Sequence, residues 1–447
     1  MNAYQYPKGN VLYRNLQRAF PLIKYGRGAY LYDLEGKKYL DGSGGAAVVN
    51  IGHGVKEIAD ALSMQASKVA YLSGVQFTHV PVEKLAEQVA EFLPFPEAKV
   101  YFLTSGSEAI EASIKLARQY WVETGKTRKY KVISRKPSYH GNTLAALSLS
   151  ARKHYQETFK PMLLQTHKIP APYCYRCPWG KAYPTCQVKC AHELEKEIQK
   201  LGRDHVSAFI TEVIGGSSTG ASVPPPEYFP IIRKICDKYE VLLITDEVMT
   251  GIGRTGKWLA SDHFDLVPDI VVLGKGLTSG YVPLSAVASK KSLVDALFKR
   301  GKSYLHAQTF AHHPVGCAAA MATLHYLRKN ELIHNCARMG AALFKKLSVL
   351  RSRPHLGDIR GRGLLIGLEL VKDQKKKTPF PRAKKYVESF IAACLEKGLV
   401  LWPNVGHADG TNGDLVLVAP PFIITDKEVS LIEERLESAL SEMEKIF

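Results

Sequence analysis

Two charged side chains stand directly after short apolar runs, and their types allow chemistry on an amine. Lys275 follows the run Ile270–Leu273 and lies between two glycines, and Asp246 ends the run that begins at Val241. Two buried strands of one sheet would carry this lysine and this carboxylate to the same edge. A lysine that bonds to an aldehyde and a carboxylate that keeps a pyridine nitrogen protonated are what pyridoxal 5'-phosphate (PLP) requires. A single lysine after a strand is more often a solvated loop charge, so this interpretation depends on the neighbouring motifs.

A turn of small residues offers a site for an anion such as phosphate. The sequence Thr104-Ser105-Gly106-Ser107-Glu108-Ala109 joins an expected strand at 99–103 to an expected helix at 108–123. A helix N-terminus presents free N–H groups and the positive end of its dipole to an anion. Gly106 permits close approach, and the Ser107 hydroxyl can add a hydrogen bond. The alternative is an ordinary helix cap, which serine provides in many helices.

Two further motifs gain meaning only from their context. Tyr139-His140-Gly141 follows the expected strand at 130–134, where an aromatic ring could stack on a planar cofactor. Taken alone, a core tyrosine and a surface histidine explain it as well. The run from Gly251 to Gly256 matches G-x-G-x-x-G but opens no helix after its strand, so we expect no dinucleotide site there.

The elements that must position these residues form an alternating pattern. Apolar runs that read as strands alternate with helical stretches from about residue 100 onward, and such alternation predicts a mostly parallel sheet covered by helices. Further strands are expected at 206–214, 241–246, 269–273 and 284–289. Parallel strands deliver the residues after them to one edge of a sheet, so the motifs above would meet there.

The character of the chain changes after about residue 330. Helical stretches there separate expected strands at 358–371, 398–402 and 414–418, which indicates a smaller α+β domain. The expected hairpin at 28–41 would join it. We therefore expect an N-terminal segment over 1–70 that packs with the small domain, a large domain over 71–330 and the small domain over 331–447.

Composition narrows the class of protein. The 447 residues carry a formal charge of +18, yet lysine and arginine are spread along the chain, which disfavours a nucleic-acid interface. No apolar run is long enough to cross a membrane, and Met1 to Asn10 has no apolar core of a secretory signal. We expect a cytoplasmic protein that binds neither nucleic acid nor membrane.

Four of the eight cysteines are clustered. Cys174, Cys177, Cys186 and Cys190 read C-x2-C-x8-C-x3-C, a spacing compatible with a structural zinc loop. Reduced thiols on an excursion rich in proline and tyrosine are the alternative. The sequence does not decide between them, and we assign no metal.

The motifs together resemble a known family. Their order and spacing are similar to those of the class III, fold-type-I PLP aminotransferases, and the resemblance runs from about residue 28 to the C-terminus. The motifs that carry it are Ser105-Gly106-Ser107-Glu108-Ala109, Tyr139-His140-Gly141, Asp246-Glu247-Val248, Gly274-Lys275-Gly276, Gln308-Thr309-Phe310 and Pro420-Pro421. The resemblance implies an α/β fold, with a mostly parallel seven-stranded sheet in the large domain and a smaller α+β domain. It also implies PLP as cofactor and a homodimer, or a dimer of dimers, with active sites at the interface.

The resemblance also implies a role for each matched residue. Lys275 resembles the Schiff-base lysine and Asp246 the pyridinium partner, which are the two catalytic positions. The matched cofactor-binding positions are Ser105, Gly106, Ser107, Tyr139, His140, Gly141, Glu212, Asp246, Val248, Lys275 and Thr309. Among them, Tyr139 and Val248 would pack on opposite faces of the ring, and Thr309 would reach the phosphate from the partner subunit.

One departure from the family bears on substrate choice. Relatives that use 2-oxoglutarate often carry an arginine shortly before the Pro-Pro pair, whereas residues 405–410 and 415–419 contain none here. The sequence therefore resembles the amine or ω-amino acid:pyruvate branch, whose members move an amino group from a primary amine or ω-amino acid to a keto acid by a ping-pong mechanism. A PLP-dependent racemase or epimerase, an amine phospho-lyase of the same family, and a non-enzymatic anion-binding or nucleic-acid-binding protein remain the alternatives.

Overall fold

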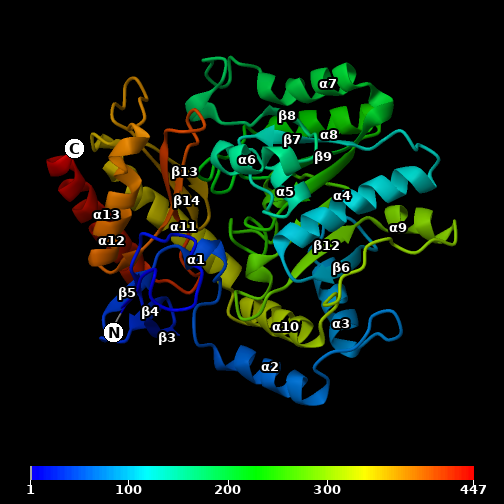
Figure 1. Cartoon of the computed structure of the whole chain (residues 1–447), viewed down its shortest axis with the longest axis horizontal. Coiled ribbons are helices and arrows are strands. Elements are labelled where there is room, and N and C mark those ends of the chain that lie inside the picture. Colours follow the sequence, from blue (N-terminus) through cyan, green and yellow to red (C-terminus); the bar gives the residue numbers. More distant parts are fainter. Residues whose placement is uncertain (1–2) are drawn as a thin grey trace.

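A seven-stranded sheet lies at the centre of the larger part of the molecule in the computed structural model, which describes residues 3–447 (Figure 1). The strand order is β6-β12-β11-β10-β9-β7-β8. Their bounds are β6 (Lys99–Leu103), β7 (Lys131–Lys136), β8 (His167–Pro170), β9 (Val206–Glu212), β10 (Leu242–Asp246), β11 (Ile270–Leu273) and β12 (Ser285–Ser289). Strand β12 runs antiparallel to both neighbours and the other pairs are parallel, which confirms the mostly parallel sheet expected from the sequence.

Helices cover both faces of this sheet because its strands are apolar on both sides. In β9, Ala208 and Ile210 pack in a cluster with α4 (Gly106–Glu123), whereas Phe209 packs in a cluster with α7 (Lys189–Leu201) and α8 (Tyr228–Tyr239). Successive strand residues point to opposite faces, so a strand buried on both reads as one continuous apolar run. The remaining helices are α1 (Gly44–Ala47), α2 (Lys56–Lys68), α3 (Val80–Ala90), α5 (Leu144–Leu149), α6 (Lys153–Phe159), α9 (Lys291–Phe298), α10 (Pro314–Lys329), α11 (Leu332–Ser348), α12 (Tyr386–Glu396) and α13 (Asp426–Ile446).

A four-stranded antiparallel sheet organises the C-terminal part. Its order is β13-β14-β17-β16, and the bounds are β13 (Leu356–Arg362), β14 (Leu365–Leu370), β16 (Trp402–Val405) and β17 (Asp414–Val418). The single strand expected at 358–371 is wrong, because Arg362 pairs with Leu365 across a tight turn. Gly363 has a φ of +57°, a left-handed conformation that glycine adopts at no steric cost and that hairpin turns need.

The N-terminal strands join the C-terminal part in space. A second four-stranded sheet has the order β15-β5-β4-β3, with β3 (Ile23–Arg27), β4 (Tyr30–Asp33), β5 (Lys38–Asp41) and β15 (Leu399–Val400), and a separate pair is formed by β1 (Ala3–Tyr4) and β2 (Phe20–Pro21). Leu40 of β5 pairs with Leu399 of β15. The division at residues 70 and 330 stays a prediction, and residues 1–2 of its first segment lie outside the described part.

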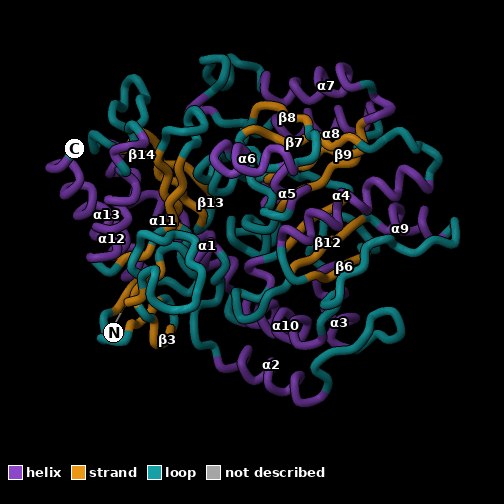
Figure 2. The backbone as a smooth tube through the Cα atoms, in the orientation of Figure 1, coloured by secondary structure: helices purple, strands orange, loops and turns teal. Residues whose placement is uncertain are grey.

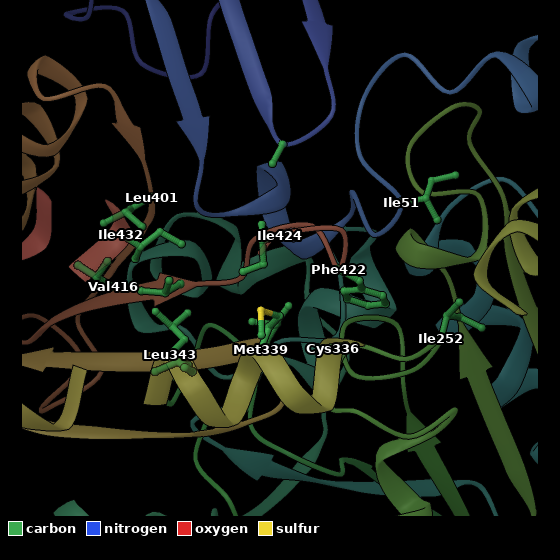
Figure 3. Close-up of a cluster of buried hydrophobic side chains, with 14 of the residues drawn as sticks. Ile51, Ile252, Cys336, Met339, Leu343, Leu401, Val416, Phe422, Ile424 and Ile432 are labelled. Atoms are coloured by element: carbon green, nitrogen blue, oxygen red, sulfur yellow. The ribbon is translucent and has the colours of Figure 1, made fainter. Parts of the chain in front are cut away.

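One apolar core connects these parts. Cys336, Met339 and Leu343 of α11 pack toward Val416 and Phe422, and the cluster continues to the turn at Ile252 and to Ile51 (Figure 3). The tube view shows helices α11, α12 and α13 gathered around the C-terminal strands, away from the seven-stranded sheet (Figure 2). No helix among residues 3–447 is long and apolar enough to cross a membrane.

Candidate active site

The carboxyl ends of β6, β7, β9, β10 and β11 meet at one edge of the large sheet. Glu212 of β9 pairs directly with Asp246 of β10, and Lys275 follows β11 after one intervening glycine. Ligands of parallel α/β sheets bind at this edge because the strand-to-helix turns supply their contacts. A cavity of about 390 Å³ lies there, and Lys275, Asp246 and Glu212 all line it.

The environment of Lys275 favours a reactive amine. Burial lowers its pKa to about 8, against the opposing influence of the Asp246 and Glu212 carboxylates. A larger share of the side chain is therefore neutral near physiological pH than for an exposed lysine. Its backbone φ of +43° is unusual for a residue with a side chain, and such conformations are concentrated at functional sites.

Asp246 is held in a fixed orientation by its neighbours. The side chain is 7% exposed, its Oδ2 lies 2.7 Å from Nδ1 of His140, and its Oδ1 accepts a hydrogen bond from the backbone N–H of Val248 at 3.1 Å. The other ring nitrogen of His140 is buried without a partner among the described residues. His140 thus orients the carboxylate, a role that the sequence motif alone does not specify.

Two glycines allow close packing in the part of the cavity lined by Tyr139 and Val248. Both side chains line the cavity. A methyl group added at Gly106 would stand 3.0 Å from Cγ1 of Val248, and one at Gly141 would stand 2.5 Å from Oγ of Ser107. Both glycines therefore permit a close approach of backbone and side chain that alanine would prevent.

The N-terminus of α4 closes one end of the cavity. Ser105 caps the helix: its backbone N–H donates to the Glu108 carboxylate at 2.9 Å and its Oγ accepts from the Glu108 N–H at 3.3 Å. The ordinary cap considered for this serine is therefore present. The Ser107 hydroxyl accepts from the N–H of Asn142 at 3.0 Å and also lines the cavity. An anion at this end would meet free helix N–H groups and a hydroxyl donor.

The structure brings the residues expected at the site together, with one exception. The expected residues that line the cavity are Ser105, Gly106, Ser107, Tyr139, His140, Gly141, Glu212, Asp246, Val248 and Lys275. Thr309 does not line it and is exposed at the surface. Its expected role in the partner's site stays a prediction.

Sequence reasoning missed the segment after β9. Ser217 lines the cavity, and its hydroxyl accepts a hydrogen bond from the guanidinium of Arg152. The run Gly215-Gly216-Ser217-Ser218 follows a buried strand, as the recognised motifs do, and that position was the available signal. Arg152 lies in a connection between α5 and α6, where no local pattern identifies it.

The clustered cysteines lie outside this cavity. Cys174, Cys177, Cys186 and Cys190 line a second cavity of about 20 Å³, and all four are free thiols. Burial and the neighbouring thiols raise the pKa of Cys190 to about 12. Across residues 3–447, no three His, Cys, Asp or Glu side chains are arranged as a metal site, so zinc gains no support from this geometry.

The glycine run from Gly251 to Gly256 has a structural role. It forms turns, and Arg254 within it is fully buried. This guanidinium donates to the carbonyls of Leu364 and Pro420 and to the side chain of Asn50. The turn therefore ties the N-terminal segment to the C-terminal sheet.

Comparison with known proteins places the chain in a family. A family model described as aminotransferase class-III matches residues 12–440. The chain belongs to the class III aminotransferases. It is 39% identical over 431 residues to the uncharacterized aminotransferase YodT of Bacillus subtilis, covering 96% of this chain and 97% of that protein.

Two relatives carry more specific names. The putrescine–pyruvate aminotransferase of Pseudomonas aeruginosa is 35% identical over 413 residues, which are 91% of this chain and 88% of that protein. Among solved structures, a thermostable (S)-enantioselective ω-transaminase of Thermomicrobium roseum superposes with a TM-score of 0.88 at 36% identity. That match covers 94% of this chain and 92% of the other. The class III fold seen in these aminotransferases is thus the fold of this chain.

Proposed function

We propose that the chain is a PLP-dependent transaminase that moves an amino group from a primary amine or ω-amino acid to pyruvate. The observation that carries this is the single cavity holding Lys275 and Asp246 on neighbouring strand ends, with the N-terminus of α4 at its edge. The putrescine–pyruvate and ω-transaminase relatives support the substrate classes.

The residues present fit the cofactor. The cavity of about 390 Å³ is of the size that small-molecule sites have. Gly106 and Ser107 would hold the phosphate, Tyr139 and Val248 the ring, Asp246 the pyridine nitrogen and Lys275 the aldehyde carbon. When bound, PLP would supply an electron sink that stabilises the charge left on a substrate carbon after loss of a proton.

The chain's own groups would perform the remaining work. The Nζ of Lys275 is neutral in a larger fraction than that of an exposed lysine, because burial lowers its pKa to about 8, and it would remove the proton from the substrate carbon that bears nitrogen. Asp246, fixed by His140 and the Val248 N–H, would stay oriented throughout. Because one cavity serves donor and acceptor, the first product leaves before the keto acid enters, which is a ping-pong sequence.

We also propose a homodimer. Thr309 is exposed, and large apolar side chains are exposed near it and along residues 69–80. Exposed apolar side chains that lie together are typical of a surface that binds another protein. The aromatic rings of Tyr71 and Phe310 lie 6.0 Å apart in this region. A second copy covering this face would bury it.

The eight free cysteines support a reducing, cytoplasmic location.

A spectroscopic titration tests the proposed reaction. The visible absorbance of the PLP-loaded protein is recorded, amines are added one at a time, and pyruvate follows. We expect the band to be lost with a suitable amine and restored by pyruvate, with alanine formed. Restoration by 2-oxoglutarate alone would contradict pyruvate as acceptor. An unchanged band with racemised product, or with release of ammonia, would identify a racemase or a lyase instead.

A further inference from the structure

Arg152 is brought to the active site by tertiary structure. The connection between α5 and α6 runs beside the Tyr139 segment, because the N–H of Ala151 donates to the Ser138 carbonyl at 3.0 Å and the His140 N–H donates to Ser150 Oγ at 2.8 Å. The guanidinium carbon of Arg152 consequently lies 4.6 Å from the centroid of the Tyr139 ring.

The guanidinium has only neutral hydrogen-bond partners in the described chain. Its Nε donates to Ser218 Oγ at 3.3 Å and its Nη2 donates to Ser217 Oγ. Among the side chains that the structure describes, no carboxylate forms an ion pair with Arg152, and no acceptor receives a hydrogen bond from its Nη1. This Nη1 is also not among the fully buried polar atoms that lack a hydrogen-bond partner.

A cation in such a place favours an anion. Burial disfavours the charged form of Arg152 and lowers its pKa to about 10, so the side chain stays charged near neutrality but is poorly compensated. The carboxylate of Glu212 acts on this charge electrostatically but forms no ion pair with it, and its Oε1 accepts the Gly216 N–H at 3.0 Å. Arginine binds carboxylates through paired N–H donors, which Nη1 and its neighbour can supply.

We propose that Arg152 and Ser217 form the carboxylate-binding end of the active site. Tyr139, on which the guanidinium lies, and Ser217, to which it is bonded, both line the cavity that contains Lys275. The substrates best served therefore carry a carboxylate beside the reacting amine or carbonyl, as amino acids and keto acids do. This inference rests on the proposed transamination. Arg152 would provide the guanidinium that is absent from residues 405–419.

Two donors that differ in one group test this role. L-alanine and isopropylamine share the amine-bearing carbon and one methyl group, and the carboxylate of alanine is replaced by methyl in isopropylamine. The rate of loss of the visible band is measured for each with wild type and Arg152→Gln. We expect the ratio of kcat/KM for alanine to that for isopropylamine to fall by about 10- to 100-fold, as for loss of a hydrogen bond to a charged group. An equal fall for both donors would show that Arg152 only supports Tyr139.

Three further measurements separate positioning from binding. Arg152→Lys keeps the charge and should recover part of the preference for alanine. Ser217→Ala should lower that preference more than Ser218→Ala, because Ser217 lines the cavity. Propionate, an unreactive carboxylate, should raise the Tm of cofactor-free wild type and not that of Arg152→Gln; no effect on wild type would overturn the inference. If no amine removes the visible absorbance band while propionate still binds, the proposed reaction is contradicted and the carboxylate site is supported.

Discussion

The two ends of the active-site cavity are specified in different ways. At the cofactor end, the residues stand in short motifs directly after strands, as Ser107 does after β6 and Lys275 after β11. At the Arg152 end, the guanidinium comes from a helix connection and meets Ser217 from a loop 65 residues further along the chain. The first end depends on strand register, and the second depends on how a connection packs across the sheet edge.

This difference explains why a gap in one motif need not mean a missing function. Residues 405–419 contain no arginine, and His407 in that stretch is buried against Glu369 at 3.0 Å. Glu369 also pairs with Arg360 at 2.8 Å, so the charges of Glu369 and Arg360 offset each other beside His407. Arg152 instead places a positive charge beside Tyr139 and Ser217, which line the cavity.

Removing the lysine should have the largest effect and tests the cofactor end directly. Lys275→Ala loses the amine that moves the proton, so kcat is expected to fall by about 10⁴-fold. Turnover is measured with an amine and pyruvate, together with the visible spectrum of the loaded protein. Lys376→Ala, in an exposed loop, is the control and should behave as wild type. Near-normal turnover of Lys275→Ala would show that Lys275 does not move the proton and would contradict the role assigned to the cofactor end.

Narrowing the cofactor end should have a smaller effect. In Gly106→Ala the new methyl group would stand 3.0 Å from Val248, and overpacking of about 1.4 kcal/mol would weaken PLP affinity about tenfold. The dissociation constant is measured by titrating cofactor-free protein. The control is Gly74→Ala, where the nearest atom lies 3.9 Å away. Equal affinities for the two variants would mean that the passage between Gly106 and Val248 does not hold the ring.

The pH dependence of cofactor attachment sharpens the account of Lys275. The neutral amine is the nucleophile, and burial lowers its pKa from 10.5 to about 8. Attachment should therefore accelerate as pH rises from 7 through 8, by about fivefold, and then level off. The rate is followed by visible absorbance after PLP is added to cofactor-free protein. A rate that continues to rise toward pH 10.5 would show that burial does not perturb this lysine.

Two neighbouring serines should separate folding from binding within one motif. Ser105→Ala removes the helix cap and should lower the free energy of unfolding by about 1 kcal/mol, seen as a lower denaturant midpoint of cofactor-free protein. Ser107→Ala should instead weaken phosphate binding and leave that midpoint nearly unchanged. If both variants changed only stability, the N-terminus of α4 would be an ordinary capped helix and no anion site.

Much of the fold was predictable because its signals are local. Apolar runs such as Ile270–Leu273 are buried on both faces, and that burial is why they read as continuous strands. The single strand expected at 358–371 was wrong because it ran through Gly363, whose left-handed conformation turns the chain back between Arg362 and Leu365. Thr309 could be matched to a motif, yet its role depends on a second chain.

The sequence by itself determined the cofactor end of the site. Parallel strands send the residues that follow them to one edge, so the order of motifs suffices to bring Lys275, Asp246 and Ser107 together. Only the tertiary structure decided the placement of Arg152 on the ring of Tyr139 and the hydrogen bond between His140 and Asp246. Those contacts join segments whose separation along the chain follows no regular pattern. The packing of the segments at the sheet edge sets the distances between these side chains.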